Sequence, residues 1–110
     1  MSVHKVDWES IAWTQVRAGI ERKSFSGSGA TLALHRIQPG HELSPHAHPH
    51  EQLVYILAGT ADFHVGEDIV RLGPGGLLAI PPNMTHYIEV VGSEVVLNLD
   101  VFTPARPEYV

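Results

Sequence analysis

Short apolar runs broken by Gly and Pro constrain the fold of this chain more than any other feature of its sequence. From Val16 onward the runs have strand length and are rich in β-branched residues, and no window keeps an amphipathic helical period over several turns. Turn-forming sequences such as Pro39-Gly40 separate them. The pattern predicts an all-β sandwich or barrel. The predicted strands cover residues 20–25, 31–37, 52–58, 60–65, 69–72, 77–80, 86–91 and 94–102.

The length of the chain predicts one domain. A chain of 110 residues buries a real core but leaves no room for a second domain beside it. The composition, 44% hydrophobic and 17% charged, is typical of a folded protein rather than a disordered one. We therefore expect a single domain over residues 1–110, with its last strand at about 94–102 and a tail at 103–110.

The charge pattern and the lack of cysteine exclude several classes of partner and site. The formal net charge is −5 and the seven Lys and Arg are scattered, so the cationic stripe that nucleic acids require is missing. Without cysteine, any metal must be bound by nitrogen and oxygen ligands. Residues 1–13 carry charges where a signal peptide needs an apolar core, and no stretch approaches the ~18–20 apolar residues of a membrane span. We expect a cytoplasmic protein without nucleic-acid or membrane partners.

Two predicted strands are apolar on both faces, at residues 53–57 and 95–99. A strand in a half-solvated sheet alternates apolar and polar residues, so the second face of these strands must be covered. The cover is either another sheet or another subunit, and we expect a homodimer.

Histidines supply the candidate chemistry. His46 and His48 are separated by one residue, so in an extended chain both side chains project from one face, and Gln52 shares that face if the strand is not bulged. His86 opens another predicted strand and supplies a third imidazole from across a barrel. A solvated His-rich turn is the alternative for the first pair alone. Four other histidines have no partner by spacing and receive no role: His4, His35, His41 and His64.

The spacing around these histidines resembles the first sequence motif of the cupin family. Five residues separate Gly40 from His46, one separates His46 from His48, three precede Gln52 and six more precede Gly59. Gln52 stands in the position that Glu usually holds in the family.

A second stretch resembles the second cupin motif. Five residues separate Gly75 from Pro81, and His86 follows at the expected offset. Asn83 stands where the family often has Gly, and Val90 where it often has Asn. Together the two motifs span about residues 40–90.

The cupin resemblance implies a single-domain double-stranded β-helix, or jelly-roll barrel, with one divalent transition metal ion. The implied ligands are His46, His48, Gln52 and His86. Because all four are neutral, the ion keeps its full charge and prefers an anionic oxygen ligand from a substrate. Nitrogen and oxygen ligands permit Zn, Ni, Fe, Mn or Co.

In the last predicted strand, polar and aromatic residues alternate with aliphatic ones. Asn98, Asp100 and Phe102 share one parity, whereas Leu99 and Val101 share the other. If the aliphatic residues face outward, the polar set lines the lumen, where a carboxylate is costly unless it is hydrogen-bonded, paired or used in a reaction. The alternative is that Asp100 reaches water or a cation near the strand end.

A narrower resemblance rests on the segments 46–52 and 100–106. They are similar to small single-domain cupins that include the KdgF-like enzymes of pectin and alginate breakdown, which convert 4,5-unsaturated monouronates to open-chain keto sugars. This resemblance implies that Asp100 transfers a proton and that Phe102 and Arg106 contact a small anionic substrate.

Three functions remain open from the sequence. The first is a metal-dependent isomerase or tautomerase that acts on a small sugar acid. The second is a cupin dioxygenase or polyketide cyclase that acts on an enolisable carbonyl, and oxygen uptake would identify the dioxygenase. The third is a cupin that binds a small molecule without changing it.

Overall fold

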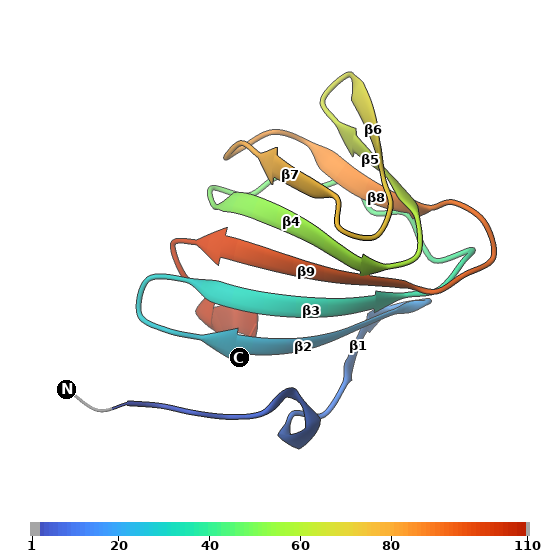
Figure 1. Ribbon diagram of the computed structural model, residues 1–110. Helices are drawn as coiled ribbons and strands as arrows, with labels where there is room; N and C mark the ends of the chain where they lie inside the picture. Colours follow the sequence, from blue (N-terminus) through green and yellow to red (C-terminus); the bar gives the residue numbers. More distant parts are fainter. Residues whose placement is uncertain (1–2, 110) are drawn as a thin grey trace.

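The computed structural model describes residues 3–109; Met1, Ser2 and Val110 of the predicted domain lie outside the described residues. The described residues form nine strands and two short 3-10 helices (Figure 1). The elements are η1 (Trp8–Ser10), β1 (Thr14–Arg17), β2 (Ile20–Ser26), β3 (Thr31–Ile37), β4 (Glu51–Ala58), β5 (Ala61–Val65), β6 (Asp68–Leu72), β7 (Leu77–Ile80), β8 (His86–Val90), β9 (Val96–Thr103) and η2 (Pro107–Tyr109).

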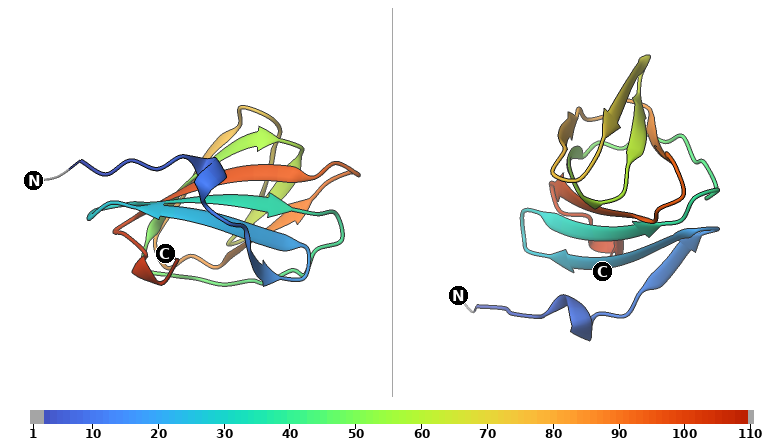
Figure 2. Two further views of the ribbon diagram at one scale, coloured as in Figure 1. Left: turned by 90° about the horizontal axis from the view of Figure 1, so that it is seen from below. Right: turned by 45° about the vertical axis from the view of Figure 1, so that its right-hand side comes forward.

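The strands form two antiparallel sheets that enclose one core. The larger sheet has the order β1-β2-β3-β9-β4-β7, and the smaller has the order β6-β5-β8. Figure 2 shows the smaller sheet folded over the larger one. The hydrophobic core lies between them, with Phe63 of β5 packed among Ile37, Ile56 and Val96 of the larger sheet. The prediction of an all-β jelly-roll is therefore confirmed.

Side chains alternate along β4 and β9, two neighbouring strands of the larger sheet. In β9, the inward residues Val96, Asn98, Asp100 and Phe102 are buried, and their neighbours in sequence are more exposed. Residue 100 pairs with residue 54 of β4 and residue 33 of β3. The predicted parity of the last strand is confirmed, and its polar side chains face the space between the sheets.

The predicted strands agree with the structure to within two residues at each end, but three elements were missed. Strand β1 has the sequence Thr-Gln-Val-Arg and is partly exposed at the sheet edge, so it lacks the apolar pattern that predicts a buried strand. The helices η1 and η2 are each one short turn of three residues. Within residues 3–109, no helix has the length and apolar character that a membrane span requires.

Two turn residues show why the motif positions need their residue types. Gly59, which closes the first motif, has a φ of 79°, and an added Cβ would lie 2.7 Å from the carbonyl oxygen of Val95. Asn83 has a φ of 65°, and Asn adopts this left-handed region more readily than most residues with a side chain. Asn83 therefore replaces the usual glycine of the second motif without changing the turn.

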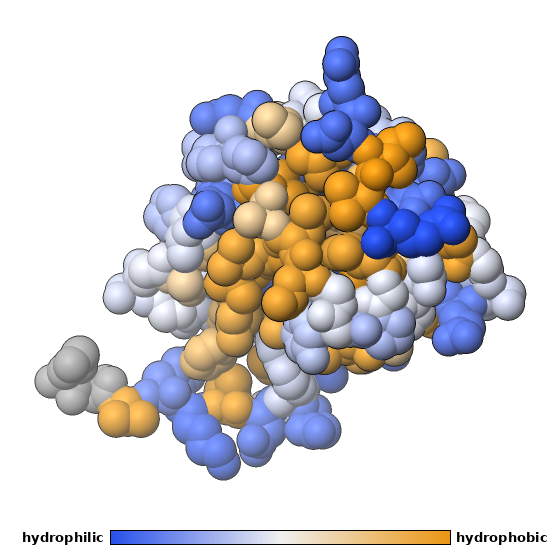
Figure 3. All heavy atoms as spheres, turned by 45° about the horizontal axis from the view of Figure 1, so that its top comes forward, coloured by the Kyte–Doolittle hydropathy of each residue, from blue (hydrophilic) through white to orange (hydrophobic). Residues whose placement is uncertain are grey.

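The outer face of the larger sheet exposes large apolar side chains. Leu53 and Tyr55 of β4 are 47% and 40% exposed, and Leu77 of β7 is 73% exposed. Tyr55 pairs directly with Leu77, so these side chains are neighbours, and Figure 3 shows hydrophobic atoms gathered in the middle of the face in view. The sequence prediction that a second copy of the chain covers this face stays a prediction.

The homodimer prediction is tested by mass in solution. We expect light scattering after gel filtration to give about twice the 12.0 kDa of one chain. The double variant Leu53→Glu, Leu77→Glu is expected to be a monomer, because two charges on each copy would be buried in the interface. The control Ile69→Glu lies on the smaller sheet, where Ile69 is 64% exposed, and should remain dimeric. A monomeric wild-type protein at micromolar concentration would contradict the prediction.

Candidate metal centre

Three histidines meet at one edge of the space between the sheets. His46 and His48 precede β4, and His86 begins β8. His46 and His86 form an isolated antiparallel bridge, with N–O distances of 3.1 and 2.9 Å in its two backbone hydrogen bonds. One ring nitrogen from each of the three histidines lies within 4.8 Å of the others. The structure thus brings together the three imidazoles that the sequence spacing selected.

Backbone carbonyl groups fix the direction of each ring. Nδ1 of His46 lies 2.7 Å from the carbonyl oxygen of Ser44, Nδ1 of His86 lies 2.8 Å from that of Met84, and Nδ1 of His48 lies 3.0 Å from that of His50. A carbonyl oxygen only accepts, so these contacts place the ring proton on Nδ1 and leave the Nε2 lone pair free. This is the arrangement that metal-binding histidines require.

The two buried imidazoles, those of His48 and His86, have lowered pKa values, which favours the neutral state that binds metal. Burial lowers the pKa of His48, and the positive charge of Arg106 lowers it further. Burial is also the main cause of the lowered pKa of His86, whose Nε2 is buried without a hydrogen-bond partner in the described structure. Because a metal ion binds only unprotonated imidazole, both effects favour the ligand form.

Gln52 directs its amide oxygen toward the same centre. Its Nε2 donates to Oδ1 of Asp100 at 2.9 Å, and this leaves Oε1 3.2 Å from Nε2 of His48. With the His48 proton on Nδ1, two lone pairs face each other across that distance. A cation between them removes the repulsion, so the four side chains fit a divalent metal ion bound by three imidazoles and one amide oxygen.

Asp100 is the acceptor that organises the polar groups behind the metal ligands. Its Oδ1 accepts from Gln52, and its Oδ2 accepts from Nδ2 of Asn98 at 3.1 Å. Nδ1 of His35 lies 3.0 Å from the same Oδ2 but outside hydrogen-bonding geometry. Asp100 is 3% exposed, and these polar contacts offset the cost of burying its carboxylate.

His35 corrects one assignment made from the sequence, which gave this residue no role. It projects inward from β3, where it pairs with Asn98 of β9 and lies beside Asp100. Its inward direction could have been found from the sequence, because it shares strand parity with the buried residues Ala33 and Ile37. The pairing of β3 with β9 could not have been found from the sequence, because the two strands are far apart in the chain.

A cavity of about 170 Å³ joins the histidine cluster to Asp100. Its lining includes His46 and His86 from the cluster, Gln52, Asp100 and Phe102. Phe102 is 2% exposed. Three of the four proposed metal ligands, the carboxylate and the predicted aromatic contact therefore line one small space.

The structure places Arg106, the predicted substrate contact, differently from these residues. The described lining of the cavity does not include Arg106. Its Nε donates to Oε1 of Glu108 at 2.9 Å, and its guanidinium group stacks on the ring of Tyr109 at 4.0 Å. Arg106 thus already has a carboxylate partner, and its contact with substrate stays a prediction.

A jelly-roll barrel in which three imidazoles and an amide oxygen converge on one point has the ligands that a metal-binding β-barrel protein needs. The chain belongs to the cupin family, because the family model described as "Cupin domain" matches residues 33–102. The predicted resemblance to small single-domain cupins is confirmed. No curated protein sequence matches the chain.

Solved structures extend the similarity over nearly the whole chain. The chain is similar to an RmlC-like cupin from Shewanella frigidimarina NCIMB 400, with 25% identity, a TM-score of 0.87, and 99% of this chain and 97% of that chain covered. For KdgF from Halomonas sp. the identity is 23% and the TM-score 0.82, over 93% and 95% of the two chains. For the polyketide cyclase RemF from Streptomyces resistomycificus the identity is 18% and the TM-score 0.75, with 94% of this chain and 80% of that chain covered. The last two likenesses show the fold alone.

Proposed function

We propose that this cupin is a metal-dependent isomerase or tautomerase that opens and ketonises a small anionic sugar acid, such as a 4,5-unsaturated monouronate. The observation that carries the proposal is the shared cavity of the histidine cluster and the buried Asp100 carboxylate. The similarity of the chain to KdgF and the matching segments 46–52 and 100–106 support the choice of substrate. A role in pectin or alginate breakdown in the cytoplasm is part of the same proposal.

The proposed reaction needs a metal centre and a group that moves a proton. Opening the sugar ring breaks the bond between C1 and the ring oxygen: the C1 hydroxyl loses its proton as C1 becomes an aldehyde, and the ring oxygen gains a proton and becomes the hydroxyl of an enol. The enol hydroxyl then loses its proton while C4 gains one, which gives the keto form. A divalent ion at the histidine cluster, when bound, supplies Lewis acidity toward a hydroxyl or ring oxygen. Asp100 is the one carboxylate among the described residues that line the cavity, so it is the group placed to move the proton.

The polar contacts of Asp100 suit this task. Side-chain amides of Gln52 and Asn98 hold its two oxygens, so the carboxylate is oriented before the substrate enters. Phe102 packs edge-on against His48, with ring centroids 5.5 Å apart, and gives the cavity an apolar wall. This wall limits the access of water to the enol.

The proposal is tested by following a known change in absorbance. Metal-loaded protein is incubated with an unsaturated monouronate, and the ultraviolet absorbance of its conjugated double bond is recorded. We expect the absorbance to decay with the wild-type protein and to remain constant with the His46→Ala variant, which lacks one proposed ligand. No decay with Zn, Ni, Fe, Mn or Co would exclude the sugar-acid reaction and leave the metal site in place.

A second candidate function is dioxygenase or polyketide cyclase chemistry. The neutral ligand set and the similarity to the cyclase RemF support it. The cavity of about 170 Å³ favours the sugar acid, because pockets for larger organic ligands measure about 300–1,000 Å³. Oxygen consumption by the iron-loaded protein would identify the dioxygenase. A bound ligand recovered unchanged would instead support a cupin that binds without catalysis.

A further inference from the structure

Arg22 is a cavity residue to which the sequence assigned no role. It lies in β2, where its register partner is His35 of β3, and His35 in turn pairs with Asn98 of β9. All three residues line the cavity together with the histidine cluster. A row of polar side chains therefore crosses the inner face of the larger sheet and ends at Arg22.

The guanidinium group of Arg22 has no acidic partner among the described residues, 3–109. Three other arginines are paired: Arg36 with Glu21, Arg71 with Asp62 and Arg106 with Glu108. Arg22 instead stacks on the ring of Tyr109, with its Cζ 3.5 Å from the ring centroid.

Arg22 is also partly withdrawn from water. Its side chain is half-buried, and burial is the main cause of its lowered pKa. An arginine keeps its charge in proteins, so a partly desolvated guanidinium group gains strongly from a carboxylate that binds through two parallel hydrogen bonds. The cavity therefore has a cationic group that a bound anion would complete.

We propose that Arg22 binds the carboxylate of the substrate, with Tyr109 holding the guanidinium group in place. This subsite deepens the proposed function and rests on its choice of a sugar acid. It also gives the substrate a direction in the cavity, with the carboxylate at Arg22 and the oxygen atoms of the ring at the histidine cluster. Arg106, which the family resemblance favours for this role, is already bound to Glu108 and lies outside the described lining.

The test separates carboxylate recognition from turnover by using ligands that do not react. NMR titrations of the zinc-loaded protein compare D-galacturonate with its methyl ester, which keeps the ring and removes the charge. We expect the wild-type protein to prefer the acid, and we expect Arg22→Gln to reduce that preference by about 10- to 100-fold, as for the loss of a charge-assisted hydrogen-bonded pair. Arg22→Lys should retain part of the preference, because it keeps the charge but loses the planar fork of donors.

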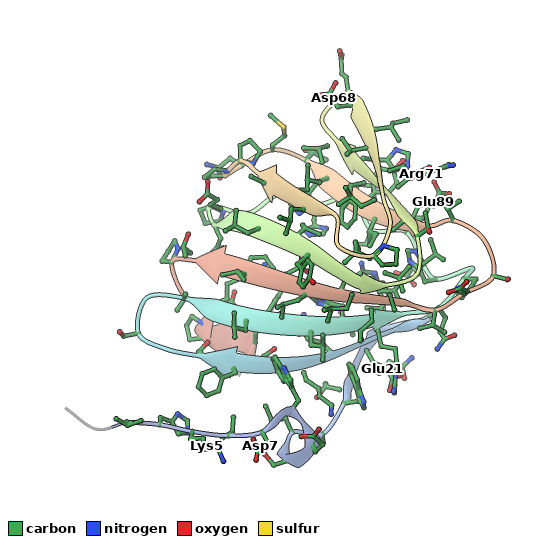
Figure 4. All side chains as sticks on the ribbon, viewed as in Figure 1. Lys5, Asp7, Glu21, Asp68, Arg71 and Glu89 are labelled. Atoms are coloured by element: carbon green, nitrogen blue, oxygen red, sulfur yellow. The ribbon has the colours of Figure 1, made fainter. Side chains whose placement is uncertain are left out.

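One control variant and one variant of the competing residue complete the test. Arg71→Gln makes the same change of charge on the hairpin of β5 and β6, away from the cavity (Figure 4), and should keep the full preference for the acid. Arg106→Gln should also keep most of it. Thermal melting of each variant identifies one that fails to fold; if Arg22→Gln does so, Arg22→Lys decides the test.

Each result of the titrations has a defined meaning. A collapsed preference in Arg22→Gln, with the full preference retained in Arg71→Gln and most of it in Arg106→Gln, supports the subsite. The proposal is overturned if Arg22→Gln and Arg22→Lys bind the acid as the wild type does, if Arg106→Gln alone loses the preference, or if the wild-type protein does not distinguish acid from ester. The ultraviolet assay tests the proposed reaction separately. If the absorbance decays but substitution of Arg22 does not change the preference for the acid, the proposed reaction stands and the subsite is excluded. If the preference depends on Arg22 but the absorbance does not decay, only the subsite stands.

Discussion

Asp100→Asn is expected to lower kcat/KM for an unsaturated monouronate by about 10²–10⁴-fold, the usual contribution of a general acid or base. The amide has nearly the same shape as the carboxylate but does not accept and return the proton. The three imidazoles keep their carbonyl partners, so we expect metal binding to remain. The ultraviolet assay at saturating metal measures the effect.

The same substitution should also lower the stability of the protein. Asp100 accepts from the amide groups of Gln52 and Asn98 and contacts His35, so an amide in its place directs a donor at another donor. One such mismatch in a buried site costs about 1–3 kcal/mol. Asp62→Asn is the control, because Asp62 pairs with Arg71 outside the cavity. Activity of Asp100→Asn equal to that of the control would remove Asp100 from the mechanism.

His86→Ala is expected to abolish high-affinity metal binding and, with it, turnover. His86 supplies the ligand from the smaller sheet, and its ring lies 4.4 Å from that of His46 and 4.9 Å from that of His48, measured between centroids. Without it the remaining ligands come from one segment and cannot surround an ion. Metal content and ultraviolet decay measure the two losses.

The melting temperature of His86→Ala should fall only modestly. The hydrophobic core around Ile56 and Phe63 does not include the histidine cluster, so the barrel does not need the ion to fold. His64→Ala is the matched control, because His64 is absent from the described lining of the cavity and contacts Glu89, which is also outside that lining. Complete unfolding of the wild-type protein on chelation would show instead that the ion is structural.

The local features of the fold could be predicted from the sequence because they depend on residues that are close together in the chain. Short apolar runs located β4 and β9, and turn sequences separated them from their neighbours. The parity of polar and aliphatic residues in the last strand placed Asp100 and Phe102 on the inner face, and the spacing of His46 and His48 located the histidine cluster. The short edge strand β1 was missed because its stability comes from pairing with β2 rather than from a pattern of its own.

The outer part of the cavity could not be predicted from the sequence because it depends on which strands are neighbours in the sheet. Arg22 and His35 reach the site only because β2 and β3 extend the sheet beyond β9, and nothing near these residues in the sequence specifies that order. The contact of Arg106 with substrate stays a prediction from the matching segment. The structure adds what the segment did not reveal: the chain turns into η2 just after Arg106 and brings Glu108 to its side chain.

The most direct test of this account is the amount of metal that the protein binds. The metal-free wild-type protein and the His86→Ala variant are dialysed against micromolar Co²⁺, and the bound metal is quantified by elemental analysis. We predict about one ion per wild-type chain, with a visible spectrum of nitrogen and oxygen ligation, and almost none in the variant. A wild-type protein that binds no ion, or a variant that binds as much as the wild type, would contradict the metal centre on which the proposed chemistry depends.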